Sequence, residues 1–207
     1  MKIDELVVVS DGSVDRTVER AMYFMGRIPG LRIEVMGINC GKWAAIHRGM
    51  EVAKNDWILL LDADGSASVD ELQILEGLPE FPLWGKREDV VGKSPLRKVL
   101  SGGYAVFVGF CYFLVMGRDP WMSDMQCPWK LFRKSWVNRA LIVERFAGDV
   151  ELALGLSKVG ADFSVKFVHK AGSKVPWTSM FVMVGETRRV ISRARRLCKI
   201  GQDVSYE

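Results

Sequence analysis

Short apolar runs alternate with helix-like segments over the first third of the chain. Runs rich in Val, Ile and Leu predict strands at residues 6–9, 31–36 and 57–61, each followed by polar residues or glycine. Apolar residues at helical spacing predict helices at 17–25 and 42–53, between those strands. Apolar strands that alternate with helices are typical of a parallel sheet covered on both faces. The pattern therefore predicts an α/β fold.

The second half of the chain has a less regular pattern. It predicts helices at 69–77, 95–116, 149–159 and 177–197, and strands at 81–84, 130–132 and 163–168. Residues 104–116 form the longest apolar stretch, which is shorter than the roughly 20 residues that cross a bilayer. We therefore expect a buried or interfacial helix there, and no transmembrane helix. Since no repeat or linker marks a boundary, we expect one domain over residues 1–207.

Charge is distributed unevenly along the chain. The net charge is only +4, and 49% of the 207 residues are apolar, as in a globular protein with a sizeable core. The predicted final helix, about 177–199, carries a basic cluster without an acid among its members: Arg188, Arg189, Arg193, Arg195, Arg196 and Lys199. Such a cluster favours a phosphate-bearing partner, and we expect a membrane surface and no nucleic acid. The alternative is an ordinary solvated helix face.

The four cysteines stand far apart, with no CxxC pair, and no secretory signal begins the chain. They predict reduced thiols in a cytoplasmic compartment. Trp121, Trp129 and Trp177 are candidates for a membrane interface, although tryptophan is also common in cores.

Two carboxylates, Asp62 and Asp64, follow the strand predicted at 57–61. In open α/β sheets, ligands bind outside the carboxyl ends of the strands. Two hard oxygen donors there suit Mg²⁺ or Mn²⁺, which completes its shell with phosphate oxygens and water. A solvated turn before a helix is the alternative, so the neighbouring loops must decide between the two.

Two further loops follow predicted strands. Glycine in Asp11-Gly12-Ser13 permits a tight turn, which leaves Asp11 to accept hydrogen bonds from a base or ribose. Residues 39–42, Asn-Cys-Gly-Lys, open a helix, where backbone N–H groups and a lysine favour an anion. Taken singly, these segments have simpler explanations as a turn and a helix cap. Asp15 or Ser13 is also a candidate cap for the helix at 17–25.

The three loops together resemble the family 2 glycosyltransferases of GT-A fold, in order and in spacing. Within that family, residues 123–133 (SDMQCPWKLFR) resemble the Asp-Thr-Gln-Cys-Gly-Phe-Lys-Leu-Phe signature of dolichyl-phosphate β-glucosyltransferases. Residues 143–151 and 172–176 are similar to later motifs of these enzymes. The resemblance runs from about residue 4 to residue 196 and also covers the related dolichyl-phosphate mannose synthases.

The resemblance implies a Rossmann-like, mostly parallel sheet flanked by helices. Members of the family begin with another strand and a Pro-x-x-Asn-Glu loop, so we expect this chain to lack the usual first strand or to build its donor pocket differently. Ser10 stands where the family usually has the first of two aspartates, and Pro128-Trp129 replaces Gly-Phe.

The resemblance also implies a function. It predicts a metal-dependent, inverting hexosyltransferase that moves glucose or mannose from UDP-glucose or GDP-mannose to a polyprenyl phosphate such as dolichyl phosphate. Mg²⁺ or Mn²⁺ would be held by Asp62 and Asp64. The predicted donor-binding residues are Asp11, Asp15, Asn39, Lys42, Asp62, Asp64 and Arg87. Those predicted for the acceptor phosphate are Arg97, Lys130, Arg133 and Lys174, because Arg and Lys suit phosphate.

The catalytic candidate is Asp124, which aligns with the general base of relatives that use hydroxyl acceptors. A phosphate acceptor is already largely ionised near neutral pH, so Asp124 would act there as base or only as an orienter of cations. We expect a peripheral protein on the cytoplasmic face of the membrane, with the apolar 104–116 segment and residues 177–183 at the interface or in the core. Two alternatives stay open: the same fold acting on a sugar hydroxyl, and a non-catalytic binding subunit of an assembly.

Overall fold

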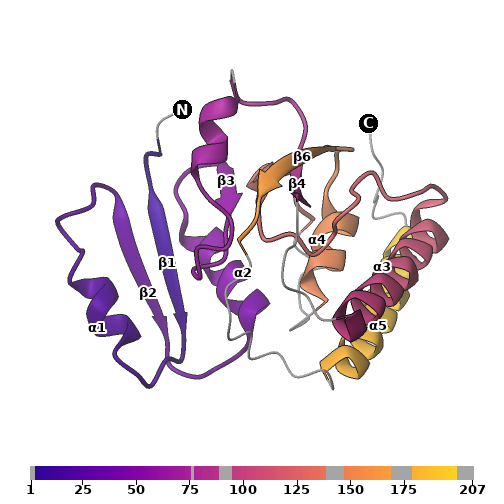
Figure 1. Ribbon diagram of the computed structural model, residues 1–207, viewed down its shortest axis with the longest axis horizontal. Helices are drawn as coiled ribbons and strands as arrows, with labels where there is room; N and C mark the ends of the chain where they lie inside the picture. Colours follow the sequence, from indigo (N-terminus) through magenta and orange to yellow (C-terminus); the bar gives the residue numbers. More distant parts are fainter. Residues whose placement is uncertain (1–2, 76, 89–94, 139–146, 169–178, 200–207) are drawn as a thin grey trace.

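The computed structural model describes residues 3–75, 77–88, 95–138, 147–168 and 179–199, and within them two sheets lie side by side (Figure 1). The smaller sheet pairs β1 (Leu6–Asp11) with β2 (Leu31–Met36) in parallel. The larger sheet has the order β3-β5-β4-β6 and is made of β3 (Trp57–Leu60), β5 (Lys130–Arg133), β4 (Leu83–Glu88) and β6 (Ala161–Lys166).

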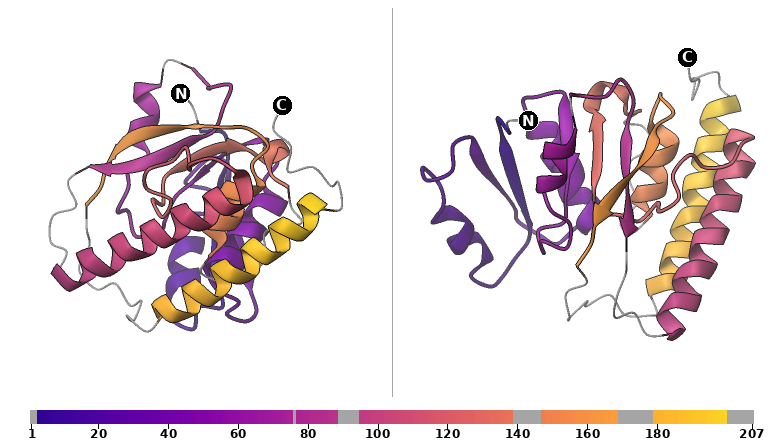
Figure 2. Two further views of the ribbon diagram at one scale, coloured as in Figure 1. Left: turned by 90° about the vertical axis from the view of Figure 1, so that its right-hand side faces the viewer. Right: turned by 45° about the horizontal axis from the view of Figure 1, so that its top comes forward.

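Helices cover both ends and one face of this arrangement. They are α1 (Thr17–Met22), α2 (Lys42–Val52), α3 (Pro95–Met116), α4 (Gly148–Gly155) and α5 (Ser179–Lys199), with short 3₁₀ turns η1 (Asp70–Ile74) and η2 (Lys134–Trp136). α1 lies beside the two-stranded sheet at one end, and α3 and α5 lie side by side at the other (Figures 1 and 2). No helix within the described ranges is long and apolar enough to cross a membrane.

The predicted α/β fold is confirmed, and the larger sheet is mixed because one of its described strands, β5, runs against the others. β1 pairs with β2, and β4 with β6, in parallel, whereas β5 runs antiparallel to both β3 and β4. α3 and the loop after it return the chain to the carboxyl end of β3, opposite Trp84 near the start of β4. β5 therefore begins there and runs back between β3 and β4.

Several predicted elements have other bounds in the structure; the helices predicted at 17–25 and 149–159, for example, end at Met22 and Gly155. β4 continues beyond the predicted strand end, because the Gly85 N–H donates to the Trp129 carbonyl at 2.8 Å and pairing with β6 extends to Glu88. The helix predicted at 69–77 is only the η1 turn. The backbone is already extended at Leu75, and Pro79 follows closely, so a longer helix has no room.

The apolar core lies between the larger sheet and α3, α4 and α5. α4 is buried along its whole length, and the largest buried side chains include Trp43, Trp84, Trp129, Tyr112 and Phe132. Trp129 is fully buried and stacks on Phe163, with ring centroids 5.0 Å apart, so of the two places considered for it the structure has the core. Trp177 lies outside the described residues.

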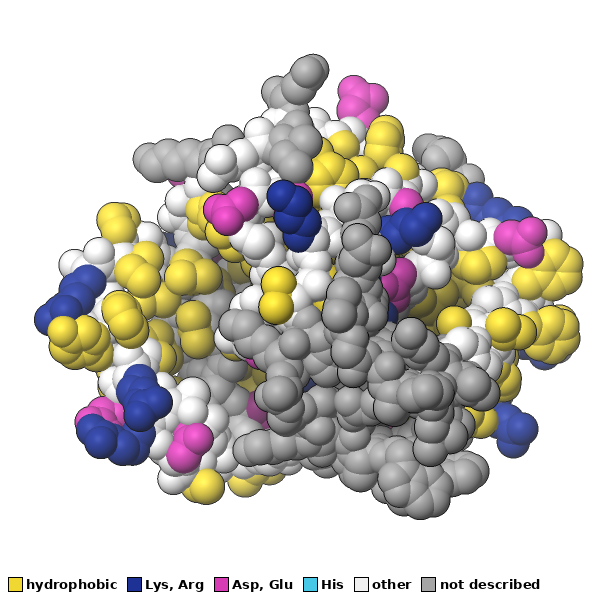
Figure 3. Space-filling view, in the orientation of Figure 1, with side chains coloured by type: hydrophobic (Ala, Val, Ile, Leu, Met, Phe, Trp, Pro, Cys, Tyr) yellow, Lys and Arg dark blue, Asp and Glu magenta, His cyan; other side chains and the backbone are white. Residues whose placement is uncertain are grey.

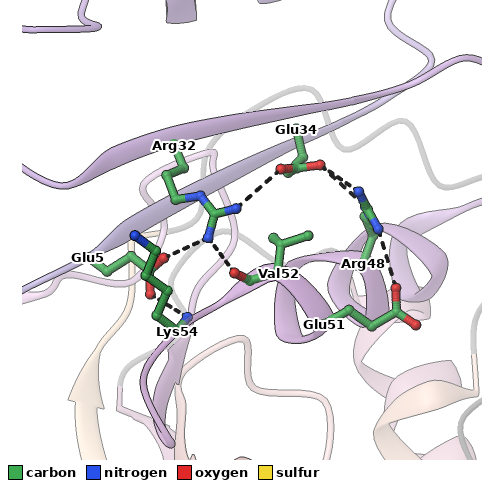
Figure 4. A network of polar contacts seen from close by, with 7 residues as sticks. All are labelled: Glu5, Arg32, Glu34, Arg48, Glu51, Val52 and Lys54. Atoms are coloured by element: carbon green, nitrogen blue, oxygen red, sulfur yellow. Dashed lines mark hydrogen bonds and ion pairs between the residues drawn. The ribbon is translucent and has the colours of Figure 1, made fainter.

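A polar network attaches the smaller sheet to α2 (Figure 4). Arg32 of β2 donates to the carboxylate of Glu5 at 3.1 Å and also to the Val52 carbonyl at the end of α2. Glu34 accepts from Arg48 of α2 at 3.0 Å. These contacts fix the C-terminal half of α2 against β1 and β2, so the position of its N-terminus is also fixed.

Candidate active site

The predicted site residues gather at one edge of the larger sheet. Leu60 of β3 and Trp84 of β4 both pair with Lys130, the first residue of the antiparallel β5. The end of β3 and the start of β5 therefore meet at the same edge, and β4 runs past it from Trp84 to Glu88. Five of the predicted side chains lie here: Lys42, Asp62, Asp64, Arg87 and Asp124.

Lys42, the first residue of α2, contacts the first carboxylate after β3. Its Nζ lies 2.7 Å from Oδ1 of Asp62. Burial lowers the pKa of Lys42, but the charges of Asp149, Asp62 and Asp64 outweigh this effect and raise the pKa above its ordinary value. Lys42 therefore carries its positive charge at neutral pH, in the middle of a group of carboxylates.

Asp64 shapes the turn that follows β3. Its Oδ1 accepts a hydrogen bond from the Ser66 N–H at 2.8 Å, across Gly65, whose φ of 64° is easily reached by glycine. The structure thus brings Lys42, Asp62 and Asp64 together, as the three-loop pattern predicted.

Asp149, in the first turn of α4, also belongs to this group, although it was not among the predicted site residues. It is 9% exposed, and its Oδ1 lies 2.6 Å from Nζ of Lys130, which is 1% exposed. Lys130 also donates to the Cys127 carbonyl, and its ammonium lies 4.6 Å from the centre of the Trp84 ring. Lys130 is therefore an internal cation that holds Asp149 in place, and it does not face solvent to grip a phosphate.

A tight contact between α2 and α4 explains why Asp149 lies near Lys42. A Cβ atom on Gly148 would stand 2.0 Å from Cδ2 of Trp43, which is 2% exposed. Only glycine permits this approach, and Trp43 and Gly148 are the direct sequence neighbours of Lys42 and Asp149. An acid after a glycine at the start of a buried helix was the sequence signal that could have marked Asp149.

Arg87 and Asp124 form a two-point ion pair. Arg87 donates from Nε to Oδ2 of Asp124 at 2.5 Å and from Nη2 to Oδ1 at 2.7 Å. Burial lowers the pKa of Arg87, but its hydrogen bonds to Asp124 and the charge of that residue outweigh burial and raise the pKa. Because both carboxylate oxygens accept from one guanidinium, the geometry favours Asp124 as an orienter of Arg87 over a general base.

The loop that carries Asp124 is fixed by packing against β4. Trp84 donates from Nε1 to the carbonyls of Asp124 and Met125, both at 3.1 Å. A Cβ on Gly85 would stand 2.7 Å from Sγ of Cys127, so this strand and loop are in close contact. Burial raises the pKa of the Cys127 thiol to about 11, and Cys127 is therefore a neutral packing residue.

The loop at residues 11–13 has another role than the predicted one in donor binding. The carboxylate of Asp11 accepts from the backbone N–H groups of Cys40 and Gly41, both at 2.7 Å, and Asn39 donates from Nδ2 to the Asp11 carbonyl at 3.1 Å. The N–H groups predicted to hold an external anion are thus bound to a side chain of the protein itself. Asp11 and Asn39 join the two loops. The N-cap of α1 is Arg16, with no side-chain cap hydrogen bond, so neither Asp15 nor Ser13 is the predicted cap; Asp15 accepts from the Thr17 N–H at 3.0 Å just before the helix.

Among the cations predicted for the acceptor phosphate, Arg133 is not at this edge. It pairs in register with Trp57, at the opposite end of β3. Its guanidinium lies 5.0 and 5.5 Å from the ring centres of Trp57 and Trp136, with which it makes cation–π contacts. The side chains of Arg97 and Lys174 lie outside the described part of the chain.

The carboxylate pair has the chemistry to bind a divalent cation. In the described ranges, no three His, Cys, Asp or Glu side chains are grouped to hold a metal ion. The protein would therefore supply Asp62 and Asp64, and phosphate oxygens and water would complete the shell of Mg²⁺ or Mn²⁺. The contact between Lys42 and Asp62 shows that this carboxylate already attracts a cation.

Comparison with known sequences places the chain in a family. The family model described as Glycosyl transferase family 2 matches residues 1–80. The dolichyl-phosphate beta-glucosyltransferase of Homo sapiens is 31% identical over 86% of this chain and 60% of that protein. The enzyme of the same name from Dictyostelium discoideum is 28% identical over 90% of this chain and 62% of that protein. The chain belongs to the family 2 glycosyltransferases, and it spans about 60% of the length of these relatives.

Solved structures of low sequence identity share the fold. Glucosyl-3-phosphoglycerate synthase of M. tuberculosis aligns with a TM-score of 0.62 at 14% identity, over 93% of this chain and 70% of that one. S. aureus TarS, in a complex with UDP-GlcNAc, aligns with a TM-score of 0.53 at 14% identity, over 92% of this chain and 57% of that one. These likenesses confirm the predicted GT-A-like fold.

Proposed function

We propose that the protein is an inverting hexosyltransferase that moves glucose or mannose from a nucleotide sugar to a polyprenyl phosphate such as dolichyl phosphate. The observation that carries the proposal is the placement of Lys42 and Asp62 in direct contact at the sheet edge. That edge is where α/β proteins bind ligands. The chain's similarity to dolichyl-phosphate beta-glucosyltransferases supports the choice of acceptor.

On the donor side, Asp62 and Asp64 would hold Mg²⁺ or Mn²⁺, which when bound neutralises charge on the departing nucleoside diphosphate. Lys42 adds a fixed ammonium group beside the same carboxylates and is positioned to contact a phosphate oxygen. Arg87 lies at the same edge, and Asp124 holds its guanidinium in one orientation.

On the acceptor side, the contacts of Asp124 and Asp149 favour a phosphate over a hydroxyl group as the group that receives the sugar. A sugar hydroxyl needs a general base, whereas a phosphate monoester has a second pKa near 6 and is already a nucleophilic anion at neutral pH. Asp124 is bound at both oxygens by Arg87, and Asp149 is paired with the buried Lys130. Neither carboxylate is arranged as a general base, which favours positioning over deprotonation.

A polyprenyl acceptor with a long chain, such as dolichyl phosphate, is confined to a bilayer, so the proposed function includes a peripheral position on the cytoplasmic face of a membrane. Cys40, Cys111 and Cys127 are free thiols, which fits a reducing compartment.

The test is a donor screen with the full-length protein, Mn²⁺ and a short, water-soluble polyprenyl phosphate. UDP-glucose and GDP-mannose are the first donors, and we expect turnover with one of them. Asp62→Ala and Asp64→Ala should each abolish turnover while the far-UV circular dichroism is unchanged. Absence of transfer from every donor, or full turnover by Asp62→Ala, contradicts the proposal.

A further inference from the structure

The helix α3 is apolar on two opposite faces. One stripe, formed by Tyr104, Val108 and Cys111, is at most 6% exposed and packs into the core. The other stripe is Val106, Phe110, Phe113 and Leu114, with exposures of 74%, 60%, 46% and 44%. The spacing of 106, 110 and 113 places these side chains on one side of the helix. Such a continuous exposed apolar stripe usually marks an interaction surface.

α5 places a basic stripe directly beside this apolar one. The two helices run in the same direction, since Tyr104 Oη lies 3.1 Å from Thr187 Oγ1 and Arg195 donates to the Leu114 carbonyl at 3.4 Å. Burial raises the pKa of the Cys111 thiol, and the charges of Arg188 and Arg195 partly offset that rise, so both guanidinium groups lie near this part of α3.

The exposed charge on this side of α5 is of one sign. Arg188, Arg189, Arg195 and Arg196 are exposed, whereas Arg193 points inward and lies 2.5 Å from the buried Glu151. The only acid in the described part of α5 is Glu186, which is 4% exposed. Figure 3 shows large hydrophobic side chains at the edge of the molecule formed by α3, with basic side chains nearby.

We propose that this α3–α5 face, made of the apolar stripe of α3 and the exposed arginines of α5, lies on a lipid bilayer that carries anionic headgroups. Apolar and aromatic side chains would enter the acyl boundary, and the arginines would contact lipid phosphates. A soluble protein partner explains the apolar stripe but not the adjoining arginines, whereas an anionic membrane explains both.

The biological role of this membrane contact rests on the proposed function, because an enzyme bound to a bilayer meets an acceptor that is dissolved in the same bilayer. The binding itself is a property of the surface and can be measured without donor, metal or acceptor. The two proposals therefore fail separately.

The experiment is cosedimentation of the full-length protein with phosphatidylcholine vesicles, with and without phosphatidylserine, at low and high salt. We expect binding that requires the anionic lipid and weakens with salt. Phe110→Ser should lower the partition coefficient about tenfold, because it removes an aromatic group from the acyl boundary. Arg188→Gln should lower it about fivefold on anionic vesicles only.

The matched control is Ile38→Ser, because Ile38 is 73% exposed but lies in the loop between β2 and α2, far along the chain from this face. It should bind as the wild type does. Failure of the wild type to bind anionic vesicles, or unchanged binding by Phe110→Ser, overturns the proposal. So does a solution dimer that Phe110→Ser converts to a monomer, since a second copy would then cover the face.

Turnover on the short, water-soluble acceptor separates the two proposals. Phe110→Ser should keep turnover within about twofold of wild type while it loses vesicle binding. Vesicle binding without any turnover by the wild type leaves the surface assignment standing and removes the proposed function.

Discussion

Removing the ammonium of Lys42 should have opposite effects on metal binding and on nucleotide binding. In the structure, Lys42 Nζ lies 2.7 Å from Asp62 Oδ1, so a divalent cation and Lys42 compete for the same carboxylate. Once a nucleoside diphosphate is bound, the ammonium instead has a phosphate to contact. Lys42→Met keeps the aliphatic length of the side chain and removes only the charge.

The expected change in Mn²⁺ affinity follows from how exposed the Lys42–Asp62 ion pair is. The side chains of Lys42 and Asp62 are 47% and 33% exposed, so solvent screens their attraction. Exposed pairs contribute about 0.2–1 kcal/mol, which converts to a gain of about 1.4- to 5-fold in affinity for Mn²⁺ alone. A hydrogen bond to a charged phosphate contributes about 1.5–3 kcal/mol, so affinity for UDP or GDP should fall about 10- to 150-fold.

The assay is a titration of Mn²⁺ followed by electron paramagnetic resonance, which measures free Mn²⁺, with the nucleotide measured separately by calorimetry. Lys54→Met is the matched control, because Lys54 stands just beyond the opposite end of α2. It should change neither affinity. A loss of Mn²⁺ affinity in Lys42→Met, or nucleotide affinity equal to wild type, would refute the reasoning.

Three further variants test the packing and the chemistry around the site. Gly148→Ala forces a methyl group onto the Trp43 ring and should lower the free energy of unfolding by about 1–3 kcal/mol or more, seen as a lower urea midpoint; an unchanged midpoint contradicts the contact. Asp124→Asn should reduce kcat only partly with a phosphate acceptor. Complete loss of turnover would instead indicate that Asp124 is the general base. Cys40 should react with a thiol reagent in the native protein and Cys127 should not. Because burial raises the pKa of Cys127 to about 11, its contribution to stability is complete below its ordinary pKa near 9 and is lost between about 9 and 11. Cys127→Ala should therefore show a smaller fall in stability over that range, measured by urea unfolding.

Much of the fold was predictable because the pattern is local. The strand at 57–60 is an apolar run ended by an acid, and α3 has the bounds that its apolar spacing and Pro95 predict. Placement of Asp62 and Asp64 after β3 follows from the same pattern. The antiparallel course of β5 was not predictable, since it depends on where α3 returns the chain and not on the composition of the strand.

The rest of the site depends on contacts between distant segments. Asp11 has the right chemistry for a ligand, but its carboxylate is bound by N–H groups of the next loop, which no local pattern indicates. Lys130 and Arg133 are both basic residues of one short strand, so the sequence does not distinguish their roles. The strand register nevertheless places them at opposite ends of β5. Asp149 joins the site only because Gly148 lets α4 pack against Trp43.

Transfer of the sugar to phosphorus-bound oxygen is the central claim, and phosphorus-31 NMR tests it most directly. The full-length protein is incubated with Mn²⁺, the donor found in the screen and an equimolar mixture of a short polyprenyl phosphate and the matching polyprenol. We predict that the monoester signal is replaced by that of a sugar phosphodiester, while the polyprenol is recovered unchanged. A glycosylated polyprenol with the phosphate signal unaltered would contradict the account.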